Sequence, residues 1–524
     1  MKRKDLLGLW MAAALLLAVR AAQAQDYNVR GTVLCDGKPV AGAVVSDGER
    51  TTLTDAAGNY GLHSTKNCGY VFLSVPAGYE VEADGLIPRH FVPLAGEPVD
   101  RADFELKRAQ NDRYTLFVLN DIHLTNTTAQ QDIRQFREKF VPDFSETLRT
   151  TPGKRYALTL GDMTTDSRWY RNNFGLPEYL AEMERVPGAI PIYNSMGNHD
   201  NDPKGPHALE EWDSVAVKTY RRVIGPNYYS FNLGRVHYVM LDNIVYLGPR
   251  KMENGKTRWD FKVGVDRTQL EWLERDLSHV KKTTPLVVCM HAPLVGSPEL
   301  KTGRAQLNEK FTEAGAADEL LEKLAGYRKV LLLTGHTHVN RHYLYSKRLR
   351  EHNNIAVAAS SWKLYGEGRR HMAKDGTPGG YAIYRVDGKK ITWSYKALGL
   401  PVDSCQFRAY DMNTVPERYG GKPGSNEVWI NVFNYDPAWK VTVREKGRRI
   451  RTERISDYDP LYRCVSEGEV PVKGTAFSPA RTEHLFRAVT AEAQTPLEIE
   501  VRDGFGRTWR QTLERPKPFG WQMR

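Results

Sequence analysis

The sequence predicts a central α/β domain between two β-rich domains. Residues 112–398 alternate long apolar, strand-like runs with helical patterns. Residues 26–108 and 399–524 instead carry short alternating runs separated by turn signals. The chain of 524 residues is also too long for a single hydrophobic core and favours about three domains. We found no internal repeat or low-complexity segment.

Residues 1–24 have the composition of a secretory signal peptide. Lys2, Arg3 and Lys4 precede an apolar segment from Leu6 to Val19, and Ala22-Gln23-Ala24 offers a small-residue cleavage site. The segment is short for a membrane span, and an uncleaved anchor is the alternative. We expect an exported protein, periplasmic or secreted, whose mature chain has no transmembrane segment. Loss of this leader changes the net charge from +11 to +8.

The first domain, residues 26–108, reads as short strands joined by turns such as Asp36-Gly37 and Ser46-Asp47-Gly48. This stretch resembles the small β-sandwich modules related to the carboxypeptidase regulatory domain. In an exported chain the cysteines can pair. We expect Cys35 with Cys68 and Cys405 with Cys464, which leaves Cys289 in a buried strand.

Five apolar runs in the central region predict strands that are buried on both faces: residues 114–120, 156–160, 190–196, 285–290 and 329–334. Helices are expected between them. One helical face carries Ile133, Phe136, Phe140, Phe144 and Leu148, and another helix opens at Asp266 with Gln269 three residues on. The third domain, residues 399–524, is again β-rich and has no metal-ligand spacing.

A short polar cluster follows each of the five apolar runs. Ligands of α/β sheets bind in the crevice outside the carboxyl ends of the strands, so we expect the clusters to converge. Each cluster alone could be a strand-end group satisfied by the backbone. Together they are Asp121-Ile122-His123, Gly161-Asp162, Gly197-Asn198-His199-Asp200, His291 and Gly335-His336-Thr337-His338.

The clusters supply carboxylate, imidazole and amide groups that suit divalent transition ions. There are too many of them for a single ion, and Asp162 has two oxygens with which to bridge. Oxygen and nitrogen ligands without thiolate favour Zn, Mn or Fe. The candidate ligands of two divalent metal ions are Asp121, His123, Asp162, Asn198, His291, His336 and His338.

The order of these motifs resembles that of the calcineurin-like metallophosphoesterase superfamily, over roughly residues 112–398. The resemblance implies a double-sheet α/β/β/α sandwich. It also implies that Asp121, His123, Asp162 and His338 hold the first metal, and Asp162, Asn198, His291 and His336 the second. The order of three domains resembles a group of exported bacterial phosphoesterases with accessory modules at both ends.

This resemblance implies hydrolysis of phosphate esters by a hydroxide that bridges the two metals. His199 is then free to assist the leaving oxygen as a catalytic residue. Asp200 is expected to orient the His199 imidazole and raise its pKa. A turn or helix cap is the alternative role for Asp200.

Two positions depart from the superfamily pattern. Many members have a second acid three residues after the bridging aspartate, whereas here Asp166 falls one place later and is not carried over as a site residue. The purple acid phosphatases have a ligating tyrosine where this chain has Thr165. A tyrosinate-bound ferric site is therefore not expected.

The expected substrate is a phosphorylated small molecule or an envelope-derived organic phosphate. Aromatic and basic residues just past the last ligands could line its pocket or pack under a loop: Trp362, Lys363, Tyr365, Arg369 and Arg370. Basic clusters are scattered without a recognition-helix pattern, so no specific nucleic acid partner is indicated. Monoesters, diesters, cyclic nucleotides and nucleic acids are not separated by the ligands. The alternative from another class is a non-catalytic surface or carbohydrate-binding protein on the same scaffold.

Overall fold

The computed structural model describes residues 27–127, 130–204, 212–255, 257–298, 305–307, 317–362, 371–404, 406–467, 477–520 and 523. Several predictions made from the sequence lie outside these residues. They are the signal peptide of residues 1–24, the pocket residues Lys363, Tyr365, Arg369 and Arg370, and the pairing of Cys405. Within the described residues, no helix is both long and apolar enough to cross a membrane.

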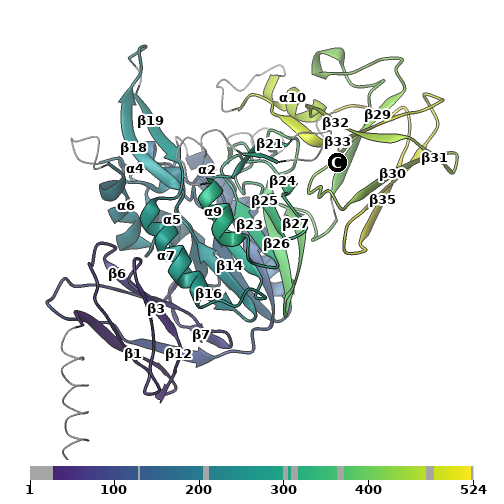
Figure 1. Ribbon diagram of the computed structural model, residues 1–524. Helices are drawn as coiled ribbons and strands as arrows, with labels where there is room; N and C mark the ends of the chain where they lie inside the picture. Colours follow the sequence, from purple (N-terminus) through teal and green to yellow (C-terminus); the bar gives the residue numbers. More distant parts are fainter. Residues whose placement is uncertain are drawn as a thin grey trace, which may run out of the picture.

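The N-terminal region contains two β-sheets, at the lower left of Figure 1. Along β1 buried residues alternate with more exposed ones, as expected for a strand with one face in a core. One sheet contains β11 (Asp100–Arg101), β1 (Val29–Cys35), β12 (Phe104–Arg108) and β7 (Tyr79–Val81), with β2 (Lys38–Pro39) and β5 (Asn59–Leu62) paired to β1. The other contains β10 (Phe91–Pro93), β6 (Tyr70–Ser74), β3 (Val44–Ser46) and β4 (Thr51–Leu53), and β8 (Ala83–Asp84) pairs with β9 (Ile87–Pro88).

The structure corrects the predicted bridge between Cys35 and Cys68, because both thiols are free. Cys35 ends β1 with its thiol 3.6 Å from Oδ2 of Asp36. Cys68 precedes β6, which belongs to the other sheet, and its thiol lies 3.1 Å from the hydroxyl of Tyr228 in the central domain. The two cysteines are therefore separated by the sandwich itself.

Two larger sheets form the central domain. The first has the order β15 (Ile192–Asn194), β14 (Lys154–Thr159), β13 (Arg113–Val118), β26 (Gly380–Asp387) and β27 (Lys390–Ala397). The second has the order β16 (Tyr229–Leu233), β17 (Val236–Met240), β20 (Leu286–Cys289), β23 (Val330–Thr334), β25 (Leu349–Asn353) and β24 (Arg341–Leu344). All five predicted strands are present, and β20 and β23 are buried throughout.

The two central sheets pack face to face with helices outside. Side chains of both sheets share one buried core, and the hydroxyls of Tyr114 on β13 and Tyr238 on β17 lie 2.8 Å apart within it. The outer face of the first sheet is covered by α2 (Gln131–Gln135), the π-helix η2 (Phe136–Phe140) and α3 (Val141–Thr150), whose aromatic side chains pack on Phe117. The second sheet carries α7 (Arg267–Ser278) and α9 (Ala317–Leu324). This is the α/β/β/α sandwich that the resemblance implies.

The helix α7 begins where the sequence predicts, and the predicted apolar helical face is buried. The carboxylate of Asp266 caps α7 by accepting a hydrogen bond of 2.9 Å from the backbone N–H of Gln269. Ile133, Phe136, Phe140, Phe144 and Leu148 are all buried on one face. The remaining helices around the centre are η3 (Asp166–Arg168), α4 (Trp169–Asn172), α5 (Leu176–Met183), η4 (Asn198–Asp200) and α6 (Trp212–Val223).

The C-terminal region consists of two four-stranded sheets around a second core, at the upper right of Figure 1. One sheet has the order β28 (Phe407–Asp411), β29 (Glu427–Val432), β33 (Arg481–Val489) and β32 (Thr452–Tyr458), with η7 (Glu417–Tyr419) and α10 (Pro460–Glu467) beside it. The other has the order β31 (Arg448–Ile450), β30 (Lys440–Glu445), β34 (Leu497–Arg502) and β35 (Thr508–Leu513). Two hairpins complete the described chain: β18 (Ile244–Lys251) with β19 (Thr257–Val263), and β21 (Val295–Pro298) with β22 (Ala305–Leu307).

Candidate metal centre

The candidate ligands follow the carboxyl ends of strands from both central sheets. Asp121 and His123 follow β13, Asp162 follows β14, and Asn198 follows β15. From the second sheet, His291 follows β20, whereas His336 and His338 follow β23. Because the two sheets pack face to face with these ends at one edge, the five clusters converge as expected.

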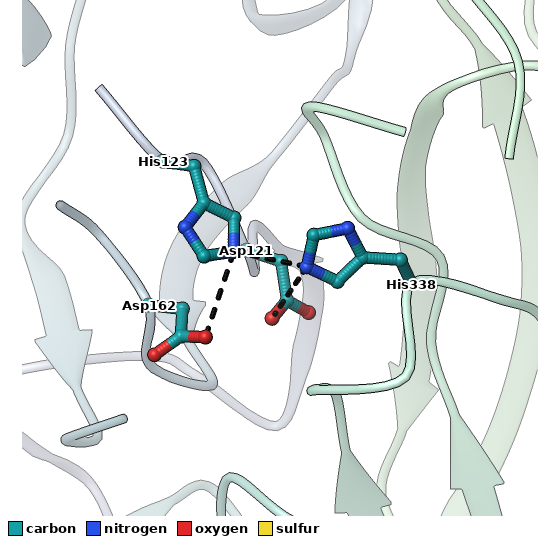
Figure 2. Close-up of side chains that lie close together, drawn as sticks. All are labelled: Asp121, His123, Asp162 and His338. Carbon is teal, nitrogen blue, oxygen red and sulfur yellow. Dashed lines mark hydrogen bonds and ion pairs between the residues drawn. The ribbon is translucent and has the colours of Figure 1, made fainter. Parts of the chain in front are cut away.

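The side chains form two groups that share Asp162. The first contains Asp121, His123, Asp162 and His338, shown in Figure 2, and the second contains Asp162, His291 and His336. Within each group the ligand atoms lie within 4.8 Å of one another. Asn198 joins the second group, since its Oδ1 lies 3.0 Å from Nε2 of His291. All seven predicted ligand residues are thus brought together.

Asp162 occupies the middle of the centre. Its Oδ2 lies 3.5 Å from Nε2 of His123 in one group and 3.3 Å from Nε2 of His291 in the other. Its Oδ1 accepts a hydrogen bond of 2.8 Å from the backbone N–H of His199. A carboxylate so placed can reach cations in both groups.

Backbone carbonyls set the tautomers of three of the four imidazoles. Nδ1 of His291 lies 2.7 Å from the carbonyl of Leu160, and Nδ1 of His338 lies 2.7 Å from that of Ala359. Nδ1 of His123 lies 3.2 Å from the carbonyl of Thr164. A carbonyl can only accept, so each Nδ1 carries the proton and each Nε2 presents a lone pair.

These lone pairs face one another, which makes the donor set fit metal ions. Nε2 of His123 lies 2.9 Å from Nε2 of His338, and Nδ1 of His336 lies 3.0 Å from Nε2 of His291. The ring protons of His123 and His338 are both committed to carbonyls, so their two Nε2 atoms repel each other unless a cation or a proton lies between them or beside them. Among the described residues no carbonyl fixes the tautomer of His336, whose contact with His291 can also be a hydrogen bond. Carboxylates in each group supply the negative charge that such a cation needs.

Burial favours the uncharged form of several of these histidines. It lowers the pKa of His336 to about 3 and holds that of His123 well below its usual range. Burial opposes ionisation of Asp162, but the neighbouring imidazoles of His291 and His199 outweigh it and hold the Asp162 pKa well below normal. Asp162 in turn raises the pKa of His291 to about 9, so a cation that binds there displaces a proton from His291. Neutral imidazole and ionised carboxylate are the states that bind metal.

The backbone at the centre adopts an uncommon conformation. Five of the seven candidate ligands have φ in the left-handed region between 50° and 68°: Asp121, His123, Asp162, His336 and His338. Non-glycine residues seldom adopt this conformation, and clusters of such strain occur at functional sites. The strand-end turns are thus bent to bring the side chains together.

Gly161 shows why the turn before Asp162 tolerates no side chain. Its φ is +91°, and a Cβ at this position would lie 2.5 Å from the backbone nitrogen of Gly197 and 2.8 Å from Nδ1 of His291. The glycine therefore allows the β14 turn to lie directly against the loop that carries Asn198 and against a ligand imidazole.

His199 lies beside the two groups with its ring held by Asp166. Nδ1 of His199 is 2.8 Å from Oδ1 of Asp166, and Oδ2 of Asp166 accepts a hydrogen bond of 2.8 Å from the hydroxyl of Tyr246. Asp166 is 1% exposed, whereas the His199 side chain is 34% exposed. Burial alone would lower the pKa of His199, but Asp162 and the hydrogen bond with Asp166 raise it to about 9.

This arrangement corrects the expected orienting role of Asp200. Its Oδ1 accepts hydrogen bonds from the backbone N–H groups of Met163 and Thr164, and its Oδ2 accepts one from that of Gly197. Among the described residues Asp200 makes no hydrogen bond to the His199 ring, and its charge only adds to the raised His199 pKa. Asp200 therefore acts as a turn cap, the alternative considered from the sequence.

The sequence does not predict the role of Asp166, and it leaves Trp362 either in a pocket wall or packed under a loop. Asp166 was set aside because it stands one place late in its motif, yet the signal was present as an acid close after Asp162. Trp362 is 2% exposed, donates to the carbonyl of Ile122 at 2.6 Å and packs on Phe136. It belongs to the core and not to a pocket wall.

Three family models match most of the chain. The model described as calcineurin-like phosphoesterase matches residues 114–340. Those described as the N terminal and the C terminal of calcineurin-like phosphoesterase match residues 27–109 and 351–509. No curated protein matches the sequence.

Several solved structures are similar at low identity. A dimetal phosphatase from Danio rerio is 13% identical over 54% of this chain and 96% of its own, with a TM-score of 0.36. A purple acid phosphatase from yellow lupin (Lupinus luteus) seeds is 11% identical over 55% of this chain and 52% of its own, with a TM-score of 0.34. A 5'-nucleotidase from Candida albicans is 10% identical over 55% and 51%, with a TM-score of 0.26. Likeness at this level carries no information about substrate.

Proposed function

The chain belongs to the calcineurin-like phosphoesterase family, and from this premise we propose that it is an exported hydrolase of phosphate esters that uses two divalent metal ions. The observation that supports two ions best is the pair of ligand groups that share Asp162. Oδ2 of Asp162 lies 3.5 Å from Nε2 of His123 in one group and 3.3 Å from Nε2 of His291 in the other. Each group supplies its own histidines, so two ions can be held, one on each side of the shared carboxylate.

The residues of the two groups have distinct tasks in this proposal. Asp121, His123, Asp162 and His338 hold one ion, and Asp162, Asn198, His291 and His336 hold the other. When bound, two such ions supply Lewis-acid catalysis: they neutralise phosphoryl charge and lower the pKa of water toward about 7. Mn, Fe and Zn all suit this nitrogen and oxygen donor set.

His199 is the general acid of the proposed reaction. Its Nδ1 proton is directed to Asp166, which leaves Nε2 to hold a proton for the oxygen that departs from phosphorus. The carboxylate of Asp166 stabilises the protonated ring and limits its rotation. The His199 side chain is 34% exposed, about twice as much as those of the ligands His123 and His338, and remains accessible to a substrate.

We propose export because of the basic, apolar and small-residue segments of residues 1–24. An exported phosphoesterase of this kind would act on small or envelope-derived organic phosphates. Monoesters are the first substrates to test, since a half-exposed general acid next to the metal groups suits release of a small alcohol.

The test is a substrate panel with the purified mature protein. The enzyme is stripped of metal, reloaded with Mn, Fe or Zn, and assayed on an aryl phosphate and a bis-aryl phosphate. Metal-dependent release of the phenol from either substrate is the expected result. Two bound metals with no turnover of either substrate would instead favour the non-catalytic scaffold, whose accessory domains would then be assayed for carbohydrate binding.

A further inference from the structure

The β18–β19 hairpin contacts both Asp166, which holds the candidate general acid, and a candidate metal ligand. Tyr246 on β18 and Phe261 on β19 are directly paired across the hairpin, so their side chains lie on the same face. The Tyr246 hydroxyl donates to Asp166. The Phe261 ring lies edge-on to His336 with 5.6 Å between ring centroids. One cross-strand pair thus reaches both sides of the centre.

The hairpin is fixed in place by the start of α6. The backbone N–H of Tyr246 donates to Oδ1 of Asp213 at 2.7 Å, and the Tyr246 ring packs against Trp212 with 6.3 Å between centroids. A Cβ on Gly248 would lie 2.4 Å from the Trp212 ring, which shows how closely the hairpin backbone lies on that side chain. Tyr246 is therefore held by contacts that do not involve the centre.

Tyr246 and His199 both donate hydrogen bonds to Asp166, one to each carboxylate oxygen. Burial raises the pKa of Tyr246 far above its usual value, so the hydroxyl stays protonated and donates to Oδ2 of Asp166. This bond commits one carboxylate oxygen and leaves Oδ1 for Nδ1 of His199. A carboxylate with both oxygens engaged cannot rotate without breaking one bond.

We propose that Tyr246 is a positioning residue for the general acid: it locks Asp166 so that Asp166 holds His199 toward the leaving group. The proposal rests on the proposed phosphoesterase function. Help from a general acid matters most when the leaving oxygen is a poor leaving group. Loss of the Tyr246 hydroxyl should therefore slow the hydrolysis of alkyl phosphates much more than the hydrolysis of phosphate esters of acidic phenols.

The experiment compares Tyr246→Phe with the parent enzyme on glycerol 2-phosphate and 4-nitrophenyl phosphate. We expect kcat to fall about ten- to a hundredfold on the alkyl ester, the range for loss of a hydrogen-bond partner that orients another side chain of the site. On the aryl ester we expect a fall of less than about threefold, because a good leaving group needs little protonation. Metal content should stay unchanged in both cases.

Tyr410→Phe is the matched control. The Tyr410 hydroxyl is also buried and donates to a carboxylate, Oδ2 of Asp459, at 2.7 Å, but it lies on β28 of the C-terminal domain. Its loss should leave the ratio of the two rates unchanged. A general loss of packing or stability would lower the rates of Tyr246→Phe and Tyr410→Phe alike.

A double variant tests whether Tyr246 acts through His199. In a His199→Ala background, Tyr246→Phe should cause no further loss on glycerol 2-phosphate, because the group that it positions is gone. Equal loss on both esters, or a full further loss in the His199→Ala background, would overturn the positioning role. If the parent enzyme hydrolyses neither ester with metals bound, the proposed function itself fails, which is a separate outcome.

Discussion

Nε2 of His123 and Nε2 of His338 lie 2.9 Å apart, although the Nδ1 proton of each ring is committed to a backbone carbonyl. The two residues come from loops after β13 and β23, which belong to different sheets. Packing of the sheets therefore brings two lone pairs together, and this contact is stable only when a cation or a proton is shared.

Replacement of the shared carboxylate should empty both halves of the centre. Asp162→Ala removes the oxygen that lies near His123 in one group and near His291 in the other. We expect activity and bound metal to be lost together, measured by turnover of an aryl phosphate and by elemental analysis of the dialysed protein. The control is Asp276→Ala, which removes a buried carboxylate that lies beside His237. This variant should retain the metals of the centre. Two metals retained in Asp162→Ala would show that the ligand assignment is wrong.

Removal of the general acid should affect turnover and not metal content. His199→Ala should lower kcat on an alkyl phosphate by about a hundredfold or more, the range for a lost general acid. Metal should stay bound, because the His199 ring forms its hydrogen bond with Asp166 and, among the described residues, forms none with the side chains of the ligand groups. The measurement is kcat alongside elemental analysis, and loss of metal would make His199 a ligand.

Asp166→Asn should reproduce part of the His199 defect, whereas the corresponding change at Asp200 should not. Asn keeps the size of Asp166 but removes the charge that helps to raise the His199 pKa. We expect about a tenfold or larger fall in kcat for Asp166→Asn on an alkyl phosphate. Asp200→Asn should chiefly lower the melting temperature, because Asp200 accepts from backbone N–H groups and from the Thr164 hydroxyl, all of which belong to the surrounding turns. The reverse pattern would restore Asp200 as the orienting residue.

A methyl group at Gly161 should disrupt the centre beyond its effect on the backbone. In Gly161→Ala the Cβ would lie 2.8 Å from the His291 imidazole, whereas in Gly153→Ala, with φ +79°, no atom lies within 4 Å. Both variants carry the positive-φ cost of about 1–2 kcal/mol. Overlap should add about 1–3 kcal/mol more for Gly161→Ala and reduce metal binding. Chemical denaturation and elemental analysis check this, and equal effects would contradict it.

His90 should make the protein sensitive to mild acid. Burial lowers its pKa from 6.5 to about 4, and the ring is enclosed by Phe91, Tyr193 and Tyr229. Between these pH values the His90 ring is protonated in the unfolded chain and neutral in the folded protein. Stability contributed by the neutral ring is thus complete above pH 6.5 and is lost as the pH falls toward 4, by about 3 kcal/mol in full.

The His90→Phe variant isolates this effect. Its free energy of unfolding should fall less than that of the parent between pH 7 and pH 4.5, and His63→Phe at an exposed histidine is the control. Equal acid sensitivity of His90→Phe and the parent would show that His90 does not contribute. The comparison uses metal-free protein, so that release of metal in acid does not enter the difference.

The sequence alone determined the strands, their terminal clusters and the family. Apolar runs such as residues 285–290 predict buried strands because run length and composition are local properties. Parallel strands end at one edge of a sheet, so the convergence of Asp121, Asp162 and His336 also followed. The order of the five motifs along the sequence was enough to identify the phosphoesterase family, and no interatomic distance was needed.

Only the tertiary structure decided which neighbours these residues contact. Asp166, and not Asp200, holds His199, because the turn after Asp162 brings Asp166 to the His199 ring. The Asp200 carboxylate instead binds two backbone N–H groups of that turn and the N–H of Gly197. Cys35 and Cys68 remain apart since the sandwich places them in different sheets. Tyr246 reaches Asp166 from a hairpin 80 positions along the chain. Such contacts depend on how sheets and loops pack together, and that packing is set by long-range contacts that no local pattern of residues encodes.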